Sequence, residues 1–437
     1  MYIQRVTIEN IRSIDHFEME FSQPAGWHVL IGDNGSGKSS ILRAIAVVLI
    51  GSDQIAATWQ NWNEWLSEGS FQGYISLEVL RGKCDGIEQE NEHKASIHKT
   101  SFLKGRDIPT FTHTSFDYPN DGGIWGKTKG WFSSGFGPFR RLIGGDSKLA
   151  TDVSSSSPIA GAHLSLFRED VVFANVLIWL KELDRIRLKE KESNTLNGVN
   201  EGSAQYNSKS EILLQHIREF INLSNLLPNN TQFESIDIDG DLVFTDSNGI
   251  QLKIYQLSDG FKSILGLVFE LIRQLIRIYG QTEVFKTFES TKTIDVPGVV
   301  LIDEVDAHLH PSWQTRIGDW FTKYFPNIQF IVTTHSPLVC RACEKGSIWR
   351  LAAPGSDMKS KEITGTDKQK LINGNILDAY GTEVFGSEVV RSAKSNELRN
   401  RLGELNIKSV LSQITDEETE ERLKLQQILS TDDPTGF

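Results

Sequence analysis

The sequence feature that most constrains the fold is a glycine-rich segment, Gly32-Asp-Asn-Gly-Ser-Gly-Lys-Ser39. It follows an apolar run, Trp27 to Ile31, and precedes apolar residues at helical spacing between Ile41 and Leu49. These patterns predict a buried strand, a tight turn and a helix from Ser39 to about Ile50. Because a strand, a glycine turn and a helix in this order open a parallel α/β unit, we expect a sheet of parallel strands around this segment.

The glycine-rich segment matches the full phosphate-loop pattern in the strand–helix context that the pattern requires. Its glycines allow backbone N–H groups to surround phosphate oxygens, and the helix N-terminus adds a partial positive charge. Lys38 would meet the β- and γ-phosphates of ATP, and the Ser39 hydroxyl would ligate Mg²⁺. The residues expected to contact ATP are Asn34, Gly35, Ser36, Gly37, Lys38, Ser39 and Ser40. The alternative interpretation is a glycine turn with an incidental lysine.

A second segment, Val299-Val-Leu-Ile-Asp303-Glu304, is an apolar run that ends in two acids. A buried parallel strand of this kind places its terminal carboxylates at the carboxyl edge of the sheet, beside the phosphate loop. Asp303 would bind Mg²⁺ directly or through water, and Glu304 would polarise the attacking water. The pattern is common by chance when it stands alone, and the phosphate loop upstream gives it weight.

Two further segments gain weight from their order in the chain. Leu257 to Ser263 reads Leu-Ser-Asp-Gly-Phe-Lys-Ser, which alone is typical of a helix N-cap and turn. Thr333 to Pro337 reads Thr-Thr-His-Ser-Pro after another buried strand, where a lone histidine is usually structural. A phosphate loop, then Leu-Ser-x-Gly, then paired acids, then a strand and a histidine is the order of the ABC ATPase superfamily, which this chain resembles.

The resemblance is closer to the soluble RecF-like, SMC-like and OLD-like branch. Alternating residues from Ile3 to Phe21 are similar to the strand pair that precedes the phosphate loop there, and Asp303 to Pro311 is similar to the branch's Walker B segment and D-loop. The match covers residues 1–50 and 250–340, with Asp259 where transporters commonly have glycine. It implies an α/β fold: an ABC-type P-loop ATPase head, with a mixed sheet flanked by helices and N-terminal antiparallel strands.

The resemblance also implies roles for individual residues. Ser258 and the Gly260 backbone would reach the γ-phosphate bound by a second subunit, and His335 would be the switch histidine that touches the same phosphate. Glu304 and His335 are then the catalytic residues, and Asp306 lies at the dimer seam. Two ATP molecules would occupy composite sites of a homodimer, which a helical tail could multiply into a higher oligomer.

The glutamine loop of the superfamily has several candidates. Three single residues are Gln54, Gln60 and Gln72. The segment from Gly135 to Gly145 is another, because its glycines and its paired arginines, Arg140 and Arg141, suit a loop near phosphate. A surface turn with solvated arginines is an equally good interpretation of that segment.

The expected domain order has four parts. Residues 1–80 form the N-terminal lobe of the head with the phosphate loop, and residues 81–230 form an inserted irregular and helical lid region, with a helix at 164–187. Residues 231–354 form the C-terminal lobe with the signature segment, the paired acids and the histidine. Residues 355–437 form a helical tail.

Composition bears on compartment and partners. No stretch approaches the roughly 18–20 apolar residues of a membrane span, and the N-terminus lacks the pattern of a signal peptide, so we expect a cytoplasmic protein with no membrane partner. Three cysteines do not make a disulfide framework, which favours a reducing compartment. The net charge of −12 leaves DNA binding possible but disfavours DNA as an avid, lone ligand.

Missing features exclude some relatives. The residues between Lys38 and Ser258 show no sustained heptads, so a long coiled-coil arm is excluded. After residue 345 no glutamate is followed by Asp-x-Asp, so a fused Toprim nuclease of the OLD kind is not expected. The N-terminal strand pair disfavours a transporter subunit.

What remains resembles the ATPase subunits of bacterial anti-phage systems such as Septu, which pair with a separately encoded nuclease. The resemblance implies an ATPase, with slow turnover allowed, whose ATP-driven dimer closure regulates a separate nuclease or other effector subunit. Two other functions stay open. One is a RecF-type DNA repair or replication ATPase, and the other is an ATP-bound structural scaffold with little turnover.

Overall fold

The chain divides into two compact units, Met1–Asn373 and Gly374–Phe437, and all the motifs above lie in the first. The computed structural model describes residues 1–80, 95–104, 110–116, 123–125, 131–142, 147–171, 173–196, 208–353, 355, 359–374, 393–411 and 413–429. No single helix in these ranges is long and apolar enough to cross a membrane. The pair Lys38–Ile50 and Ser52–Thr58 is long and apolar enough for this when the two helices are taken together, but the chain bends by 115° between them.

An antiparallel sheet of the first unit has the strand order β2-β1-β4-β5-β6. Its strands are β1 (Tyr2–Ile11), β2 (Ile14–Glu20), β4 (Gln72–Leu80), β5 (Ala95–Leu103) and β6 (Thr110–Phe116). Buried residues alternate along β1 and β4, so Val6 lies opposite Leu77 and Ile8 opposite Ile75 on one buried face. The alternation from Ile3 to Phe21 therefore predicted this sheet's first two strands correctly.

The central sheet of the unit has six strands in the order β14-β13-β3-β12-β11-β7. They are β3 (Gly26–Ile31), β7 (Ser133–Phe136), β11 (Gly298–Ile302), β12 (Ile328–Thr333), β13 (Ile348–Arg350) and β14 (Lys361–Ile363). All neighbouring strands are parallel except β14, which runs antiparallel to β13. β3, β11 and β12 are buried along their whole lengths, as expected for parallel strands covered on both faces.

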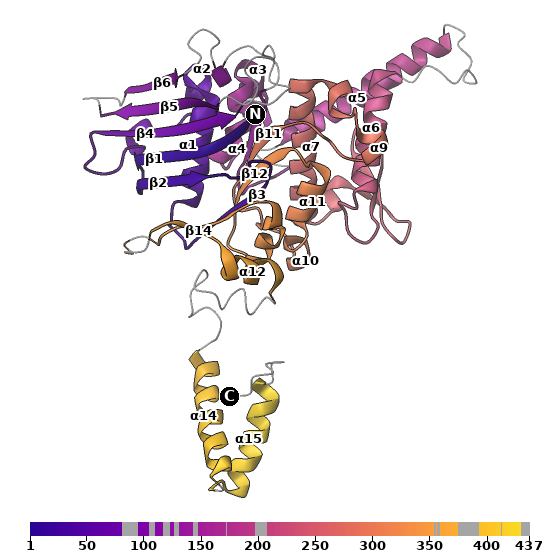
Figure 1. Ribbon diagram of the computed structural model, residues 1–437. Helices are drawn as coiled ribbons and strands as arrows, with labels where there is room; N and C mark the ends of the chain where they lie inside the picture. Colours follow the sequence, from indigo (N-terminus) through magenta and orange to yellow (C-terminus); the bar gives the residue numbers. More distant parts are fainter. Residues whose placement is uncertain are drawn as a thin grey trace. The chain divides into compact units, whose positions relative to one another are not determined.

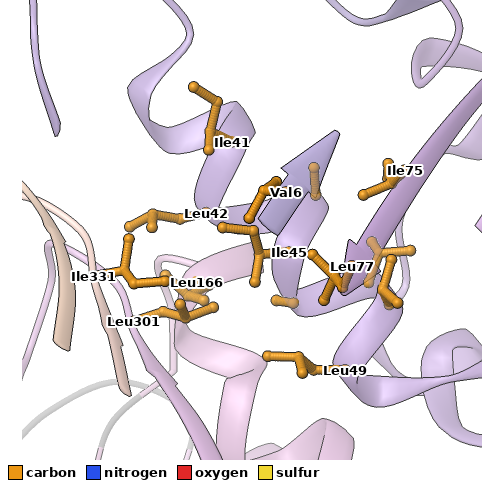
Figure 2. Packing of buried hydrophobic residues seen from close by; sticks show 14 of the residues in the cluster. Val6, Ile41, Leu42, Ile45, Leu49, Ile75, Leu77, Leu166, Leu301 and Ile331 are labelled. Carbon is orange, nitrogen blue, oxygen red and sulfur yellow. The ribbon is translucent and has the colours of Figure 1, made fainter. Parts of the chain in front are cut away.

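Helix α1 (Lys38–Ile50) lies between the two sheets (Figure 2). Its apolar residues Leu42, Ile45 and Leu49 are buried, which matches the helical spacing seen in the sequence. Residues of both sheets and of α4 surround them: Val6, Ile75, Leu77, Leu166, Leu301 and Ile331. Since burying one such side chain contributes about 1.5–3 kcal/mol, this cluster fixes the helix that begins at the phosphate loop.

Other helices cover the far side of the central strands, and Figure 1 shows α7 and α11 there. The α-helices of the first unit are α2 (Ser52–Ile55), α3 (Ser147–Ser156), α4 (Pro158–Phe167), α5 (Ala174–Leu196), α6 (Lys209–Leu223), α7 (Asp259–Tyr279), α8 (Gln281–Val284), α9 (Phe288–Thr291), α10 (Pro311–Gln314), α11 (Ile317–Tyr324) and α12 (Gly365–Asn373). Short 3₁₀ segments are η1 (Ala56–Thr58), η2 (Trp62–Glu64), η4 (Gly123–Trp125), η5 (Ile254–Gln256) and η6 (Pro337–Lys345). A small sheet, β10-β9-β8, comprises Gln251–Lys253, Leu242–Thr245 and Gln232–Ile236.

The described residues between 95 and 230 form more strands than the sequence predicted. They supply β5 and β6 to the antiparallel sheet and β7 to the central sheet. The helix predicted at 164–187 is wrong as one element, because α4 ends at Phe167 and α5 begins at Ala174. The backbone at Arg168 is extended, which interrupts the helical hydrogen bonds there.

The boundary predicted between residues 354 and 355 also lies elsewhere. The first compact unit continues to Asn373 because β14 pairs with β13 and α12 follows it. The Lys368 ammonium donates to the Gly346 carbonyl oxygen at 2.7 Å, which ties α12 to the end of η6. The helical tail proper begins only after this segment.

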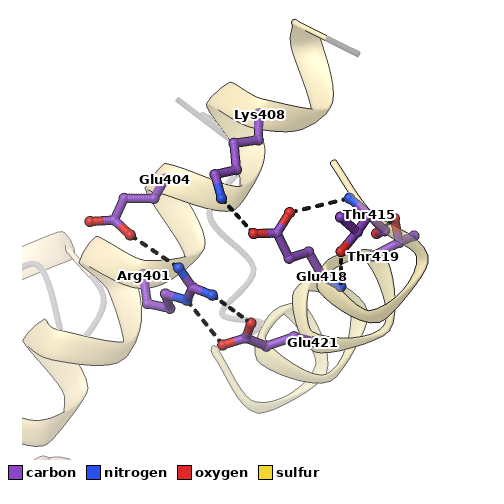
Figure 3. Close-up of polar contacts among 7 residues, drawn as sticks. All are labelled: Arg401, Glu404, Lys408, Thr415, Glu418, Thr419 and Glu421. Atoms are coloured by element: carbon purple, nitrogen blue, oxygen red, sulfur yellow. Dashed lines mark hydrogen bonds and ion pairs between the residues drawn. The ribbon is translucent and has the colours of Figure 1, made fainter. Parts of the chain in front are cut away.

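Among the described residues of the second unit, the helices are α14 (Ala393–Val410) and α15 (Asp416–Leu429). Polar contacts join them (Figure 3): Arg401 donates to both carboxylate oxygens of Glu421, at 3.1 and 2.9 Å, and Lys408 pairs with Glu418. The Thr415 hydroxyl accepts from the Glu418 backbone N–H at 3.2 Å and so caps the start of α15.

Candidate nucleotide-binding site

The phosphate loop joins β3 to α1, and two of its glycines hold backbone conformations that other residues rarely adopt. Gly35 has φ 80° and Gly37 has φ 90°, both in the left-handed region. A Cβ at Gly37 would also lie 3.3 Å from Ile14 Cγ1, so the turn between β1 and β2 packs directly on the loop. These two positions explain why glycine recurs in the motif.

The polar residues of the loop differ in exposure. Asn34 and Gly35 are exposed, whereas Ser36, Ser39 and Ser40 are half-buried. The Ser36 hydroxyl oxygen is buried and has no hydrogen-bond partner within the described ranges. Such an unsatisfied group is rare in folded proteins and marks a place where a ligand could supply the missing bond.

Lys38 is the buried cation of the loop. Its ammonium donates to the carbonyl oxygens of Gly32 and Asp33 at 2.7 and 2.9 Å. Burial lowers the pKa of Lys38, and the nearby carboxylates of Asp303 and, more weakly, Glu304 oppose that shift. The lysine therefore lies in the field of the paired acids that follow β11.

A threonine at the end of β12 fixes the paired acids. The Thr333 hydroxyl donates to Asp303 Oδ1 at 2.6 Å and accepts from the Glu304 backbone N–H at 2.7 Å. Asp303 is almost fully buried, and its backbone N–H donates to the Phe136 carbonyl on the neighbouring β7. The Thr333 hydroxyl thus positions both the side chain of Asp303 and the backbone of Glu304.

Glu304 has an unusual backbone conformation. Its φ is 45°, in the left-handed region that costs a non-glycine residue about 1–2 kcal/mol. Val305 returns to the sheet by donating from its N–H to the Thr333 carbonyl at 3.0 Å. Strained residues of this kind persist only where the surroundings hold them, and they cluster at functional sites.

The signature segment meets the D-loop rather than the phosphate loop of its own chain. Ser258 is the N-cap of α7, it is exposed, and its side chain caps no backbone N–H of that helix. A Cβ at Gly260 would lie 2.6 Å from the His308 carbonyl oxygen, so only glycine allows this approach. A hollow lined by Ser258, Gly260, His308 and Trp313 opens between the two segments.

His335 and Asp306 follow neighbouring strands. His335 is exposed directly after β12, and the adjacent Thr334 hydroxyl donates to Asp306 Oδ1 at 2.5 Å. The structure therefore brings Lys38, Asp303, Glu304 and His335 to the carboxyl ends of the neighbouring strands β3, β12 and β11. Ser258 and Gly260 lie against the D-loop, which is a separate surface of the chain.

The glutamine-loop candidates Gln54 and Gln72 have different surroundings. The Gln54 side chain accepts from the backbone N–H groups of Ile159 and Ala160 at 2.9 and 3.3 Å, and so caps the start of α4. Gln72 is exposed at the start of β4. Arg140 is buried behind the acids instead of lying in a solvated turn, while Arg141 is exposed. Sequence reasoning singled out the segments that contain Arg140 and Thr333, but it did not predict that these two residues contact the paired acids.

A nucleotide with Mg²⁺ fits this edge of the sheet. Ser36 offers a buried unpaired hydroxyl, Lys38 a cation, and Ser39 and Asp303 the hard oxygen donors that Mg²⁺ prefers. Across the described ranges no group of three or more His, Cys, Asp or Glu side chains could hold a metal ion without other donors.

Two family models match parts of the chain. The model described as "AAA ATPase domain" matches residues 1–108. The model described as "AAA domain, putative AbiEii toxin, Type IV TA system" matches residues 228–341. The first match contains the phosphate loop. The second contains the signature segment, the paired acids and the histidine.

The chain is also similar to several named proteins. It is 26% identical to the Retron Ec83 probable ATPase of Escherichia coli (79% of this chain, 70% of that protein) and 26% identical to the Septu protein PtuA of Bacillus mycoides (79% and 40%). It is 27% identical to the Retron Vc95 probable ATPase of Vibrio cholerae (71% and 66%). The chain thus spans less than half the length of that PtuA and about two thirds of the retron proteins.

Among solved structures, an SmcHead bound to the C-winged helix domain of ScpA aligns with a TM-score of 0.47 and 16% identity, covering 85% of this chain and 100% of that chain. The strand order, the motifs and the two family matches describe an α/β ATPase head with a mixed central sheet and N-terminal antiparallel strands. The chain accordingly matches ATPase-domain models in two segments and is similar to the retron probable ATPases and to Septu PtuA.

Proposed function

We propose that this protein is an ATP-hydrolysing dimer switch that regulates a separate effector, a nuclease, in bacterial anti-phage defence. The observation that carries the ATPase part is the arrangement of Lys38, Asp303 and Glu304 at the ends of neighbouring strands, with Thr333 holding both acids. The matches to ATPase domains and to probable ATPases support the same activity.

The proposed chemistry assigns one task to each residue. The N–H groups of residues 35–38 and the N-terminus of α1 receive the phosphates, and Lys38 Nζ donates to them. Ser39 and Asp303 would hold Mg²⁺, which would supply positive charge beside the phosphates. Glu304 accepts a proton from the attacking water, and its backbone, held by Thr333, keeps the carboxylate in place.

The proposed dimer follows from the placement of the signature segment. Ser258 is exposed and caps no N–H of α7, so its hydroxyl is available to a second subunit, and Gly260 is half-buried beside it in the first turn of the helix. In the dimer, Ser258, the Gly260 backbone and His335 of one protomer meet the γ-phosphate held by the other. ATP binding closes this interface and hydrolysis reopens it. The signature residues thus make the site composite.

The effector part of the proposal rests on the relatives. Septu PtuA and the two retron ATPases are each similar over more than two thirds of this chain. The anti-phage resemblance implies a separately encoded nuclease, whose activity would depend on whether the dimer is closed.

Two variants test the ATPase. Lys38→Ala is expected to abolish binding of a fluorescent ATP analogue, because the loop loses its cation. Glu304→Gln is expected to bind ATP, to release phosphate at least about 100-fold more slowly, and to run as a dimer in Mg-ATP during size-exclusion chromatography with light scattering. Lys286→Ala and Glu283→Gln, whose native side chains are 66% and 42% exposed, serve as matched controls. Rapid phosphate release by Glu304→Gln would remove this residue from the catalytic role.

The partner is tested by purification of the tagged chain from its native operon with Mg-ATP, followed by mass spectrometry. A stoichiometric nuclease that is released from Lys38→Ala supports the proposal. A lone dimer that retains DNA only with ATP, and less at high salt, would favour the DNA-repair alternative. Nucleotide that stays bound through purification without phosphate release would favour the scaffold.

A further inference from the structure

Arg140 lies in the segment after β7 and is only 4% exposed. Its guanidinium donates to backbone carbonyl oxygens and to one hydroxyl within the first unit. The acceptors are Gly137 O (3.1 Å), Asp303 O (2.9 Å), Glu304 O (3.0 Å), Val305 O (3.4 Å) and Ser263 Oγ (3.2 Å). A single side chain therefore contacts three successive residues of the acidic turn and one residue of α7.

The guanidinium remains charged although it is buried. Burial lowers the pKa of Arg140 to about 10, and the carboxylates of Asp306, Asp303 and Glu304 oppose this shift. A buried charge is costly unless hydrogen bonds and opposite charges compensate for it. Most of the acceptors here are backbone carbonyl oxygens. They are contacted by several N–H groups of one planar guanidinium, and a lysine ammonium does not have this branched set of donors.

The carbonyl groups that Arg140 contacts would not converge in a regular strand. Successive residues of an extended strand point to opposite sides, so three neighbouring carbonyls meet one cation only if the backbone leaves that conformation. The left-handed conformation of Glu304, with φ 45°, provides this departure. The guanidinium thus offsets the strain of the conformation that presents the Glu304 side chain.

The fifth contact connects this turn to the signature helix. Ser263 is buried in α7, which begins directly after Ser258. Its hydroxyl is the acceptor for Arg140 Nε. A shift of α7 at the subunit interface would therefore act on the same guanidinium that holds the acidic turn.

We infer that Arg140 is a positioning residue that holds Glu304 in its hydrolytic conformation and couples the signature helix to it through Ser263. This inference rests on the proposed ATPase function. It assigns different roles to the two arginines in the segment 135–141. Arg140 contacts the backbone of the paired acids, whereas Arg141 has no such role.

The test measures kcat, KM and the Kd of a fluorescent ATP analogue for Arg140→Met, Arg140→Lys and Ser263→Ala in the full chain. We expect the Kd to stay within about threefold, because the phosphate loop is untouched. We expect kcat to fall about 10–100-fold in Arg140→Met, the size of effect that a displacement of about 1 Å produces, and less in Arg140→Lys. Arg187→Met removes a half-buried, ion-paired arginine of α5 and serves as the matched control.

The coupling is tested by the double variant Arg140→Met/Ser263→Ala. If the hydroxyl acts through the guanidinium, Ser263→Ala lowers kcat in the wild-type background and has no further effect in Arg140→Met. Additive losses of kcat would overturn the coupling. If Arg140→Met does not fold, Arg140→Lys and Ser263→Ala carry the test.

Failure of this inference is distinguishable from failure of the proposed function. Wild-type protein that binds ATP but releases no phosphate contradicts the ATPase itself. Wild-type protein that hydrolyses ATP while the Arg140 variants keep its kcat contradicts only the positioning role. Equal losses of affinity and kcat would also contradict it, because they would indicate general disruption of the site.

Discussion

Helix α1 belongs to the first compact unit (the head, Met1–Asn373), and helix α14 belongs to the second (the tail, Gly374–Phe437). Different forces hold these two helices in place. Ten of the thirteen residues of α1 are buried, and apolar side chains of two sheets surround it (Figure 2). In the tail, Leu405 and Leu425 are the buried apolar residues among those whose exposure is described, and ion pairs join its helices (Figure 3). Exposed ion pairs contribute little to stability. The head therefore supplies its own core, whereas the tail leaves Ile407, Val410 and Leu411 in solvent.

The most sensitive test of this contrast truncates an isoleucine to alanine in each of the two helices. Ile45→Ala removes a fully buried side chain beneath the phosphate loop and should lower the free energy of unfolding of the head by about 2–5 kcal/mol. Ile407→Ala, at a position that is 62% exposed, should change stability by less than about 0.5 kcal/mol. Urea unfolding followed by tryptophan fluorescence measures the loss in the head, because every tryptophan precedes residue 374, and amide exchange across residues 397–411 measures the loss in the tail. Equal losses from the two variants would contradict the contrast.

A second test uses glycine in both regions. A Cβ at Gly318 of α11 would lie 2.4 Å from Ala342 Cβ, so Gly318→Ala should destabilise the head by about 1–3 kcal/mol. A Cβ at Gly403 of α14 meets nothing within 4 Å, so Gly403→Ala should stabilise the tail by about 1 kcal/mol through helix propensity. Urea unfolding measures the first change, and slower amide exchange across residues 397–411 measures the second. Effects of the same sign would show that the two helices are packed alike.

The smallest expected effect is on the pH dependence of the tail. The hydrogen bond from Arg401 lowers the pKa of Glu421, and the one from Lys408 lowers the pKa of Glu418. Their stabilising contribution is therefore present above the ordinary glutamate pKa of 4.5 and is lost as the pH falls through the lowered values. Amide protection factors across residues 397–426 should fall between pH 7 and pH 3. The fall should be smaller in Arg401→Gln, and an unchanged pH dependence in that variant would rule out this ion pair as its cause.

The sequence was sufficient for the elements whose signals are local. The alternation from Ile3 to Phe21 predicted two strands, and the phosphate loop predicted β3 and α1. The ATPase resemblance is confirmed by the family matches. The roles of individual site residues and the effector remain predictions, which the variants described above test.

The remaining parts depend on residues far apart in the chain. The segment with Arg140 has the composition of a surface turn, and its burial is decided by carbonyl groups at Asp303 to Val305. Thr333 looks like any residue at the end of an apolar strand until Asp303 lies beside it. The end of the head at Asn373 was missed because β14 has three residues and no usable periodicity.

The order of strands in the central sheet has a consequence for synthesis of the protein. β3 carries the phosphate loop, yet both of its neighbours, β12 and β13, lie near the other end of the head. A nascent chain that has not reached Arg350 holds an apolar strand with no partner on one or both edges. Such strands pair late in folding, and until then their exposed edges can pair with non-native strands. Nucleotide binding by this fold would then distinguish a fully translated head from a truncated fragment that carries the same glycine-rich motif.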